Sequence, residues 1–433
     1  MAIVICLTLT GCMSSSPTME YDHNSAGEAG KQQLSITLVS RWKSQLLVQK
    51  LQRFTEEHPD VEIKIEWANS YNDLVSDQYV MFAPWTRIEH PSELYKDAKN
   101  VPDIVELVPN QMRELYHRGI IEPLNINETD LDEYTIKSDD GYVLGTRSKI
   151  NPMILYYNKD IFAMYGIEAP NDGWDINSLN DAIVKLKAAG ETVYIPLSPF
   201  TLEWATGLYG GRIVGVDGRT FEGYMDSEEA TKAAKWITDI GTKMDYHAHI
   251  VTDMQPPMPY DLAAGKIALA VDFAYGFNLS TSMKNSYEEI AQENNGIGIA
   301  ALPGVKDGIN PAFISGLSLT SKSPHKGMAM QLISYLMKDR DSLYKDIATY
   351  TLQAATSSLN ESVDAAREAI LIQSMARAVP ATLYWHEAHT NFYDAIQLSL
   401  PQQLLAIRNG QEASEELKRY ASQLEDEFGR LAD

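Results

Sequence analysis

Two stretches near the start of the chain decide the fold class: LSITLVS at residues 34–40 and VEIKIEW at residues 61–67. Both are rich in β-branched residues and alternate apolar with polar positions, which is typical of strands. Between them, apolar residues recur at helical spacing, at Leu46, Leu47, Leu51 and Phe54. A polar segment with helical character at residues 71–81 and a third strand at 103–108 follow. Strand, helix, strand, helix, strand is the start of a doubly wound α/β sheet.

Strands and helices continue to alternate along the rest of the chain. The sequence predicts extended segments at residues 141–158, 193–197, 267–272, 296–302 and 312–320. It predicts helices at residues 159–165, 177–189, 227–242 and 260–265, and over most of the chain from Pro324 onward. Asn177 is the expected N-cap of its helix, because its side chain can accept from the first free backbone N–H groups.

The composition is that of a globular protein with more than one domain. A chain of 433 residues, 44% hydrophobic and 22% charged, predicts two or three domains. Its 36 basic and 59 acidic residues give a net charge of -23, which excludes nucleic acid as an expected partner. With only Cys6 and Cys12, a disulfide framework or a cysteine-rich metal site in the body is excluded.

The first residues have the pattern of an export signal. Residues 2–10 (AIVICLTLT) form an apolar run too short to span a bilayer, but long enough for the core of a signal peptide. The run ends in LTGC at residues 9–12, which resembles the bacterial lipobox. The resemblance implies that residues 1–11 are removed and that Cys12 carries a lipid. Residues 12–33 are polar and without periodicity, and we expect them to be a flexible tether.

An ordered series of short motifs runs through the body. The motifs are PDIVE at residues 102–106, RGIIEPL at 118–124, LYYNKDIFAMYGIEAP at 155–170, GWD at 173–175, LAAGKIAL at 262–269 and ALPG at 301–304. In this order and spacing they resemble the extracellular solute-binding proteins of ABC importers, in the sugar-binding group that is similar to maltose-binding protein. The resemblance covers nearly the whole body.

The resemblance implies an α/β fold of two doubly wound lobes, joined by a hinge and enclosing an interlobe ligand cleft, the type II periplasmic-binding-protein architecture. The chain is expected to cross between the lobes near residues 150–154 and 313–319. Lobe 1 would hold residues 34–151 plus 265–312, and lobe 2 residues 152–264 plus 313–433.

A sugar has apolar C–H faces and a polar rim, so its site needs aromatic platforms with hydrogen-bonding groups around them. Residues of these types that follow strands or match the family's contact positions are the candidate ligand contacts: Arg41, Trp42, Asn110, Gln111, Phe200, Trp204, Asp272, Tyr275, Phe277, Trp385 and Tyr393.

Several candidates also have a structural interpretation. Trp42 is either a platform or a packing residue, and Asn110 and Gln111 either contact the ligand or cap a turn. Asp272 either accepts from sugar hydroxyls or caps the next turn. Among the aromatic residues at positions 384, 385, 392 and 393, the sequence does not show which faces the cleft. Trp174 and Trp236 are expected to be structural.

The sequence lacks the motifs of a catalytic or metal centre. The histidines of YHAH at residues 246–249 and HEAH at 386–389 do not have the spacing of HExxH zinc enzymes. A nucleophile elbow, a Walker loop and a GxGxxG turn after a strand are missing as well. We therefore expect no enzyme activity, no metal and no cofactor.

The primary functional hypothesis is a lipid-anchored receptor at the extracellular face of the bacterial cytoplasmic membrane. It would bind a carbohydrate, most simply an oligosaccharide, and deliver it to the membrane permease subunits of an ABC importer, acting as a monomer. The alternatives are a receptor of the same fold that signals through a sensor kinase, and a secreted carbohydrate-active enzyme with a pair of carboxylates. The charge of the sugar stays open, because Arg41, Lys43 and Arg147 near the expected cleft allow an acidic sugar.

Overall fold

The fold was analysed in a computed structural model. It describes residues 32–39, 45–68, 102–126, 135–171, 173–215, 218, 220–240, 262, 265–274, 296–304, 310–338, 365–380 and 390–432. The predicted helices at residues 71–81 and, apart from Leu262, 260–264 lie outside these ranges, as do the expected signal peptide and nearly all of the expected tether.

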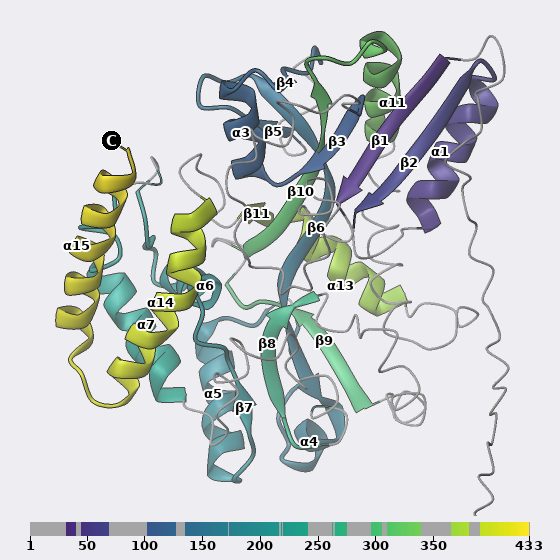
Figure 1. The fold of residues 1–433 in the computed structure, drawn as a ribbon. Coiled ribbons are helices and arrows are strands. Elements are labelled where there is room, and N and C mark those ends of the chain that lie inside the picture. The colour runs from purple at the N-terminus through teal and green to yellow at the C-terminus, as the bar shows by residue number, and fades with distance from the viewer. Residues whose placement is uncertain are drawn as a thin grey trace, which may run out of the picture.

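A single long strand, β6 (Val143–Asn158), runs through the centre of the molecule and belongs to two halves of one sheet (Figure 1). Over Thr146–Pro152 it pairs with β10 (Asn310–Thr320). Over Met153–Asn158 it pairs with β8 (Leu269–Phe273) and β9 (Ile297–Ala301). We call the two parts the upper and lower halves. The pairing partner of β6 changes between Pro152 and Met153, within the residues 150–154 where a crossing was expected.

The upper half contains the start of the doubly wound sheet. Its further elements are β1 (Gln32–Val39), α1 (Gln45–Glu57), β2 (Val61–Ala68), β3 (Ile104–Leu107), α3 (Pro109–His117), β4 (Ile121–Glu122), β5 (Thr135–Lys137), α11 (Lys326–Lys338) and β11 (Ala378–Pro380). β1 pairs in parallel with both β2 and β3, whereas β10 pairs with β3 in the antiparallel direction. The strand order β2-β1-β3-β10-β6-β8-β7 confirms the predicted α/β class.

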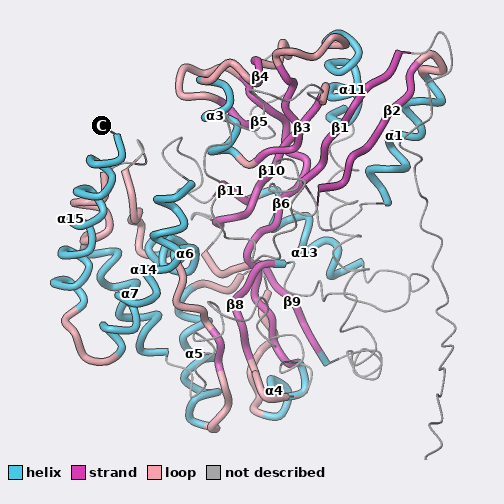
Figure 2. Tube along the Cα trace, in the orientation of Figure 1, coloured by secondary structure: helices cyan, strands magenta, loops and turns pink. Residues whose placement is uncertain are grey.

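The lower half carries most of the helices (Figure 2). Its elements are α4 (Lys159–Met164), α5 (Ile176–Ala188), β7 (Val193–Tyr194), α6 (Pro199–Leu208), α7 (Glu228–Ile240), α14 (Thr390–Arg408) and α15 (Ala413–Ala432), with β8 and β9. The apolar faces of α6, α7, α14 and α15 share one core, which includes Leu202, Ile237, Leu404 and Leu417. The long C-terminal helices therefore belong to this half.

Strand pairing corrects the predicted lobe boundaries in two places. β8 and β9 lie in the lower half, although residues 265–312 were expected in lobe 1. The backbone of Ala268 explains this, since its N–H donates to the carbonyl of Thr192 and its carbonyl accepts from Asn158. α11 packs with α1 and β10 in the upper half, although residues 313–433 were expected in lobe 2. The second crossing accordingly lies between β9 and β10, a few residues before the predicted one.

Single N-cap side chains determine where helices α5 and α6 begin. Helix α5 begins one residue earlier than predicted, because Asp175 and not Asn177 is its N-cap and accepts from the N–H of Ser178 at 2.9 Å. This hydrogen bond holds the pKa of Asp175 below its usual value. Helix α6 was not predicted. It begins with Ser198 as N-cap and Pro199 in its first turn, which is a common helix start.

Trp174 and Trp236 are structural, as predicted. The Trp236 indole packs against the lower core and donates to Asn180 at 2.6 Å, and Trp174 packs against Phe162. Gly298 marks a close approach within β9. A Cβ atom there would lie 2.1 Å from the ring of Tyr157.

Candidate functional site

The crossing strands, β6 and β10, carry different side chains on their two faces. On β10, Ala312 and Ile314 belong to a buried core that also contains Ile150 and Ile154 of β6. This core joins residues of both halves and is covered by α13 (Ala365–Ala376), which contributes Leu371 and Met375. Because apolar packing closes this face, a ligand held between the halves would have to approach from the opposite face.

The opposite face carries three polar side chains, which we call the floor cluster: Glu106, Ser148 and Ser315. Glu106 of β3 is only 1% exposed. The hydroxyls of Ser148 on β6 and Ser315 on β10 both donate to its Oε1 atom, at 2.7 and 2.6 Å. Both serines are partly exposed. The cluster thus connects the two crossing strands to the neighbouring strand of the upper half.

A β-bulge brings Ser148 into the floor cluster. β10 residues Ser315 and Gly316 pair with Lys149 and Arg147, so Ser148 is the extra residue between them. Gly316 makes room for this irregularity, since a Cβ atom there would lie 2.3 Å from the carbonyl oxygen of Thr146. Bulges change the direction in which a side chain points and are frequent next to functional sites.

Three rings lie beside the floor cluster, and we call them the phenylalanine cluster: Phe200, Phe273 and Phe313. Their centroids are 4.6–4.8 Å apart. They come from the start of α6, the end of β8 and β10, and Phe273 and Phe313 keep part of their surface exposed. Phe313 and Ser315 share a face of β10, because side chains alternate along a strand. An apolar patch and a polar patch therefore adjoin where the halves meet.

The first turn of α3 follows β3 directly and contains two predicted contacts. The Gln111 side chain accepts from the N–H of Val108 at 3.2 Å, which is the capping role considered for it. Asn110 is buried, and its Oδ1 atom has no hydrogen-bond partner among the described residues. A buried acceptor without a partner is costly, so Asn110 stays a candidate for contact with a ligand.

Asp272 lies at the end of β8, next to the phenylalanine cluster. Its Oδ1 atom accepts from the N–H of Phe273 at 2.7 Å, which is the local capping role considered for it. Burial raises its pKa to about 6, against which this hydrogen bond acts. The hydroxyl of Tyr156 donates to the carbonyl of Phe273 at 2.8 Å, and burial with the nearby Asp272 raises the pKa of that phenol.

Trp204 lies in the core and not at an open surface, which corrects the expectation of a ligand contact there. Its side chain is 1% exposed and packs edge-on against Trp236, with ring centroids 5.7 Å apart. The cause is the apolar run of α6, where Phe200, at the helix start, reaches the phenylalanine cluster and Trp204, one turn later, faces the helices of the lower half. Phe200 is 4% exposed and is the buried member of the phenylalanine cluster.

The other predicted contacts lie outside the described residues. These are Arg41, Trp42, Tyr275, Phe277 and Trp385; for Tyr393 the structure describes the backbone in α14 but not the side chain. The parallel pairing of β1 with β3 means that Arg41 and Trp42 follow a strand whose end lies beside the floor cluster. Tyr275 follows Phe273 by two residues. Their roles stay predictions.

Five residues of this region were missed by sequence reasoning: Glu106, Ser148, Phe273, Ser315 and Phe313. One signal was available, since Glu106 is a carboxylate in an otherwise apolar strand, IVEL. The place of Ser148 depends on the bulge and that of Phe313 on the pairing of distant strands.

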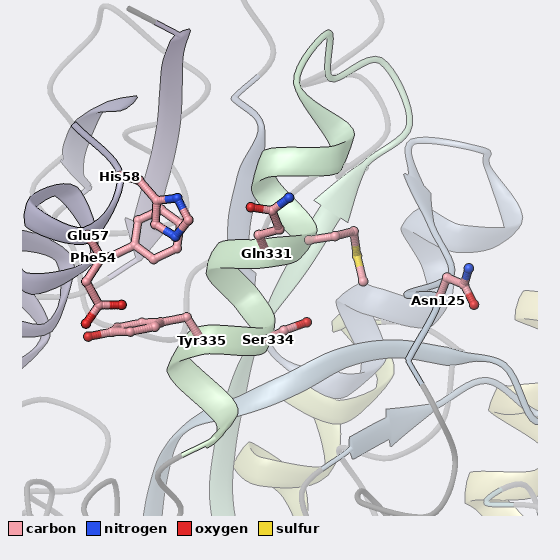
Figure 3. Close-up of a pocket in the computed structure, with 8 residues that line it drawn as sticks. Phe54, Glu57, His58, Asn125, Gln331, Ser334 and Tyr335 are labelled. Carbon is pink, nitrogen blue, oxygen red and sulfur yellow. The ribbon is translucent and has the colours of Figure 1, made fainter. Parts of the chain in front are cut away.

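A separate pocket of about 380 Å³ lies in the upper half, between the end of α1 and α11 (Figure 3). Phe54, Glu57 and His58 line one side, and Gln331 and Tyr335 lie on α11. The ring of Phe54 packs against His58 at 4.3 Å and against Tyr335 at 5.2 Å. This pocket belongs to the helices on the outside of the upper sheet and does not include the floor cluster.

Within the described part of the chain, three or more histidine, cysteine or acidic side chains do not gather into a metal-binding group. His247, His249, His386 and His389 lie outside it. The helices described here are also too short or too polar to cross a bilayer.

Solved structures with the same architecture cover nearly the whole chain. An extracellular solute-binding protein of Staphylococcus aureus in complex with maltose is 15% identical, with a TM-score of 0.65 over 93% of this chain and 99% of that one. A sugar-binding protein of Xanthomonas citri is 14% identical, with a TM-score of 0.64 over 92% and 98%. A cyclo/maltodextrin-binding protein complexed with maltotetraose is 12% identical, with a TM-score of 0.64 over 93% and 98%.

The fold is therefore that of the two-lobed α/β solute receptors, as the sequence predicted. The model of the bacterial extracellular solute-binding protein family matches residues 43–341, more than half of the chain. The chain belongs to this family. Its site of action accordingly lies outside the cytoplasm.

Proposed function

We propose that the protein captures a carbohydrate in the cleft between its halves and delivers it to the permease subunits of an ABC importer. The observation that carries the proposal is the floor cluster beside the phenylalanine cluster, on the face of the crossing strands opposite the core that both halves share. An exposed ring edge suits the C–H face of a sugar, and the hydroxyls and carboxylate suit its rim.

The ligands of similar proteins support a saccharide. The solved structures with this fold include complexes with maltose, maltotetraose, acarbose and cycloalternan. Trp42 and Tyr275 follow strands that end at the cleft and would supply further platforms. We infer that the protein binds the sugar without cleaving it, because catalytic motifs are missing from its sequence.

Calorimetric titration against a panel of solutes tests this function. The panel contains glucose, maltose and maltotetraose, glucuronate as an acidic sugar, and amino acids as another solute class. We expect saturable binding of at least one saccharide to one site per chain, with the sugar recovered intact by mass spectrometry. The proposal would be refuted if no saccharide bound, if only amino acids bound, or if the sugar were recovered cleaved.

We further propose that Cys12 anchors the protein by a lipid. LTGC at residues 9–12 and the polar segment that follows support a lipid and a tether ahead of β1 (Gln32–Val39). The lipid on Cys12 would hold the protein at the outer face of the cytoplasmic membrane, next to the permease.

A further inference from the structure

We propose that Ser148 and Ser315 form a hydroxyl-binding subsite on the cleft floor, oriented by Glu106, and that this subsite selects a neutral sugar over an acidic one. The inference rests on the proposed function and deepens it, because it assigns contacts and a charge preference to the ligand.

The hydrogens of both serine hydroxyls point to Glu106. A serine hydroxyl has one hydrogen and two acceptor lone pairs. Both hydroxyls give their hydrogen to Oε1 of Glu106, at 2.7 and 2.6 Å. Their remaining capacity is therefore to accept. Since both side chains keep part of their surface exposed, they offer two oriented acceptors to groups that donate, such as sugar hydroxyls.

The two serines lie where the crossing strands pass from one half to the other. Along the cleft face of β10, Leu317 and Leu319 belong to the upper core, whereas Phe313 packs against the lower core. Ser315 lies between them and is the point at which this face changes from one half to the other. A ligand bound there would contact both acceptors and the neighbouring ring of Phe313, which is the combination that a pyranose ring needs.

The charge of Glu106 affects which ligands the subsite favours. The carboxylate of Glu106 lies directly behind the two hydroxyls and is buried, so solvent screens it poorly. A sugar carboxylate at the subsite would meet two acceptors and a like charge. Arg147 precedes Ser148, and its Nη1 atom donates to the carbonyl of Ala378 at 3.4 Å. The two serine acceptors therefore suit a ligand group that donates and not an anion.

Glu106→Gln tests the charge preference. An amide of the same shape keeps one oxygen that can accept from both serine hydroxyls, but it carries no negative charge. We therefore expect nearly unchanged binding of the neutral saccharide, with maltose and maltotetraose as probes. The ratio of affinities for maltose and glucuronate should shift toward glucuronate by at least about tenfold. A merely structural residue would weaken both to the same extent.

Ser148→Ala and Ser315→Ala keep the proposal testable if the glutamine variant folds poorly. Each should weaken binding of the neutral saccharide about five- to twentyfold, because a ligand hydroxyl loses its acceptor. Ser321→Ala is the matched control. It lies just beyond β10, donates to the carbonyl of Gly119 at 2.6 Å, and should leave affinity unchanged.

The outcomes separate this inference from the function on which it rests. A wild-type protein that binds no saccharide overturns both. A wild-type protein that binds a saccharide, with selectivity unchanged in Glu106→Gln and affinity unchanged in both serine variants, overturns the subsite alone. Preference of the wild-type protein for glucuronate over every neutral sugar also overturns the charge preference.

Discussion

At the scale of single residues, the end of β8 places the buried carboxyl group of Asp272 next to a candidate ligand surface. Asp272 accepts from the N–H of Phe273 and lies near Tyr156, and burial raises its pKa to about 6 from an ordinary 3.8. A carboxyl group with a raised pKa binds a proton more tightly in the folded protein than in the unfolded chain. Folding is therefore helped by protonation and opposed by ionisation of this group.

Asp272→Asn should change how stability depends on pH. Between about pH 4 and 6 the folded wild type retains a proton that the unfolded chain has released, so its free energy of unfolding falls as pH rises. The shift corresponds to about 1–3 kcal/mol, discounted for the partial exposure of the side chain. Urea unfolding at pH 4 and 7 should show this loss in the wild type and not in the variant. Parallel pH profiles would contradict the burial of the charge.

Phe313→Ala should weaken sugar binding. Its partly exposed ring adjoins the floor cluster, and loss of an aromatic contact costs about 1–2 kcal/mol. Phe221→Ala is the control, because Phe221 is fully buried in the lower core. It should lower stability by about 3–5 kcal/mol and leave the affinity of the folded protein unchanged. Equal affinity of Phe313→Ala and wild type in titrations would remove this ring from the site.

At the scale of elements, the crossing strands depend on an irregular pairing. The bulge at Ser148 and the close approach of Gly316 to Thr146 allow β6 and β10 to meet while the serine points to Glu106. The sequence predicted these strands within a few residues, since their apolar patterns are long. It did not predict the bulge or the partners of Glu106, because register between distant strands leaves no local signal.

Gly316→Ala should destabilise the protein by about 1–3 kcal/mol, because its Cβ atom would collide with backbone that cannot easily move. Gly327→Ala offers a matched control on α11, where no atom lies within 4 Å of the new Cβ. That exchange should stabilise by about 0.5–1 kcal/mol, because alanine favours helix. Thermal unfolding distinguishes the two. An equal effect of both would show that the approach at Gly316 is unimportant.

At the scale of the whole molecule, one sheet is divided into halves that β6 joins, with a shared core on one face and the floor and phenylalanine clusters on the other. Such an arrangement lets two rigid bodies move about a few strand residues and close on a ligand. Motif order predicted the class and the first crossing. The lobe boundaries were wrong at β8, β9 and α11, because their assignment depends on pairing and packing and not on local pattern.

Cys12→Ser should release the protein from the membrane. Lipid attachment needs the thiol, and serine cannot replace it, so the variant should lose metabolic labelling with palmitate and move to the soluble fraction. Cys6→Ser is the control and should stay labelled, since Cys6 lies in the segment that is expected to be removed. Labelling that survives Cys12→Ser would refute the anchor.

The most direct test of the central claim is native mass spectrometry of the folded protein mixed with the saccharides of the panel. The account predicts one intact neutral saccharide per chain, released on denaturation, with lower occupancy in Phe313→Ala than in Phe221→Ala. A spectrum of the bare chain in the presence of millimolar saccharide, or equal occupancy in both variants, would contradict carbohydrate capture at the face where β6 and β10 cross.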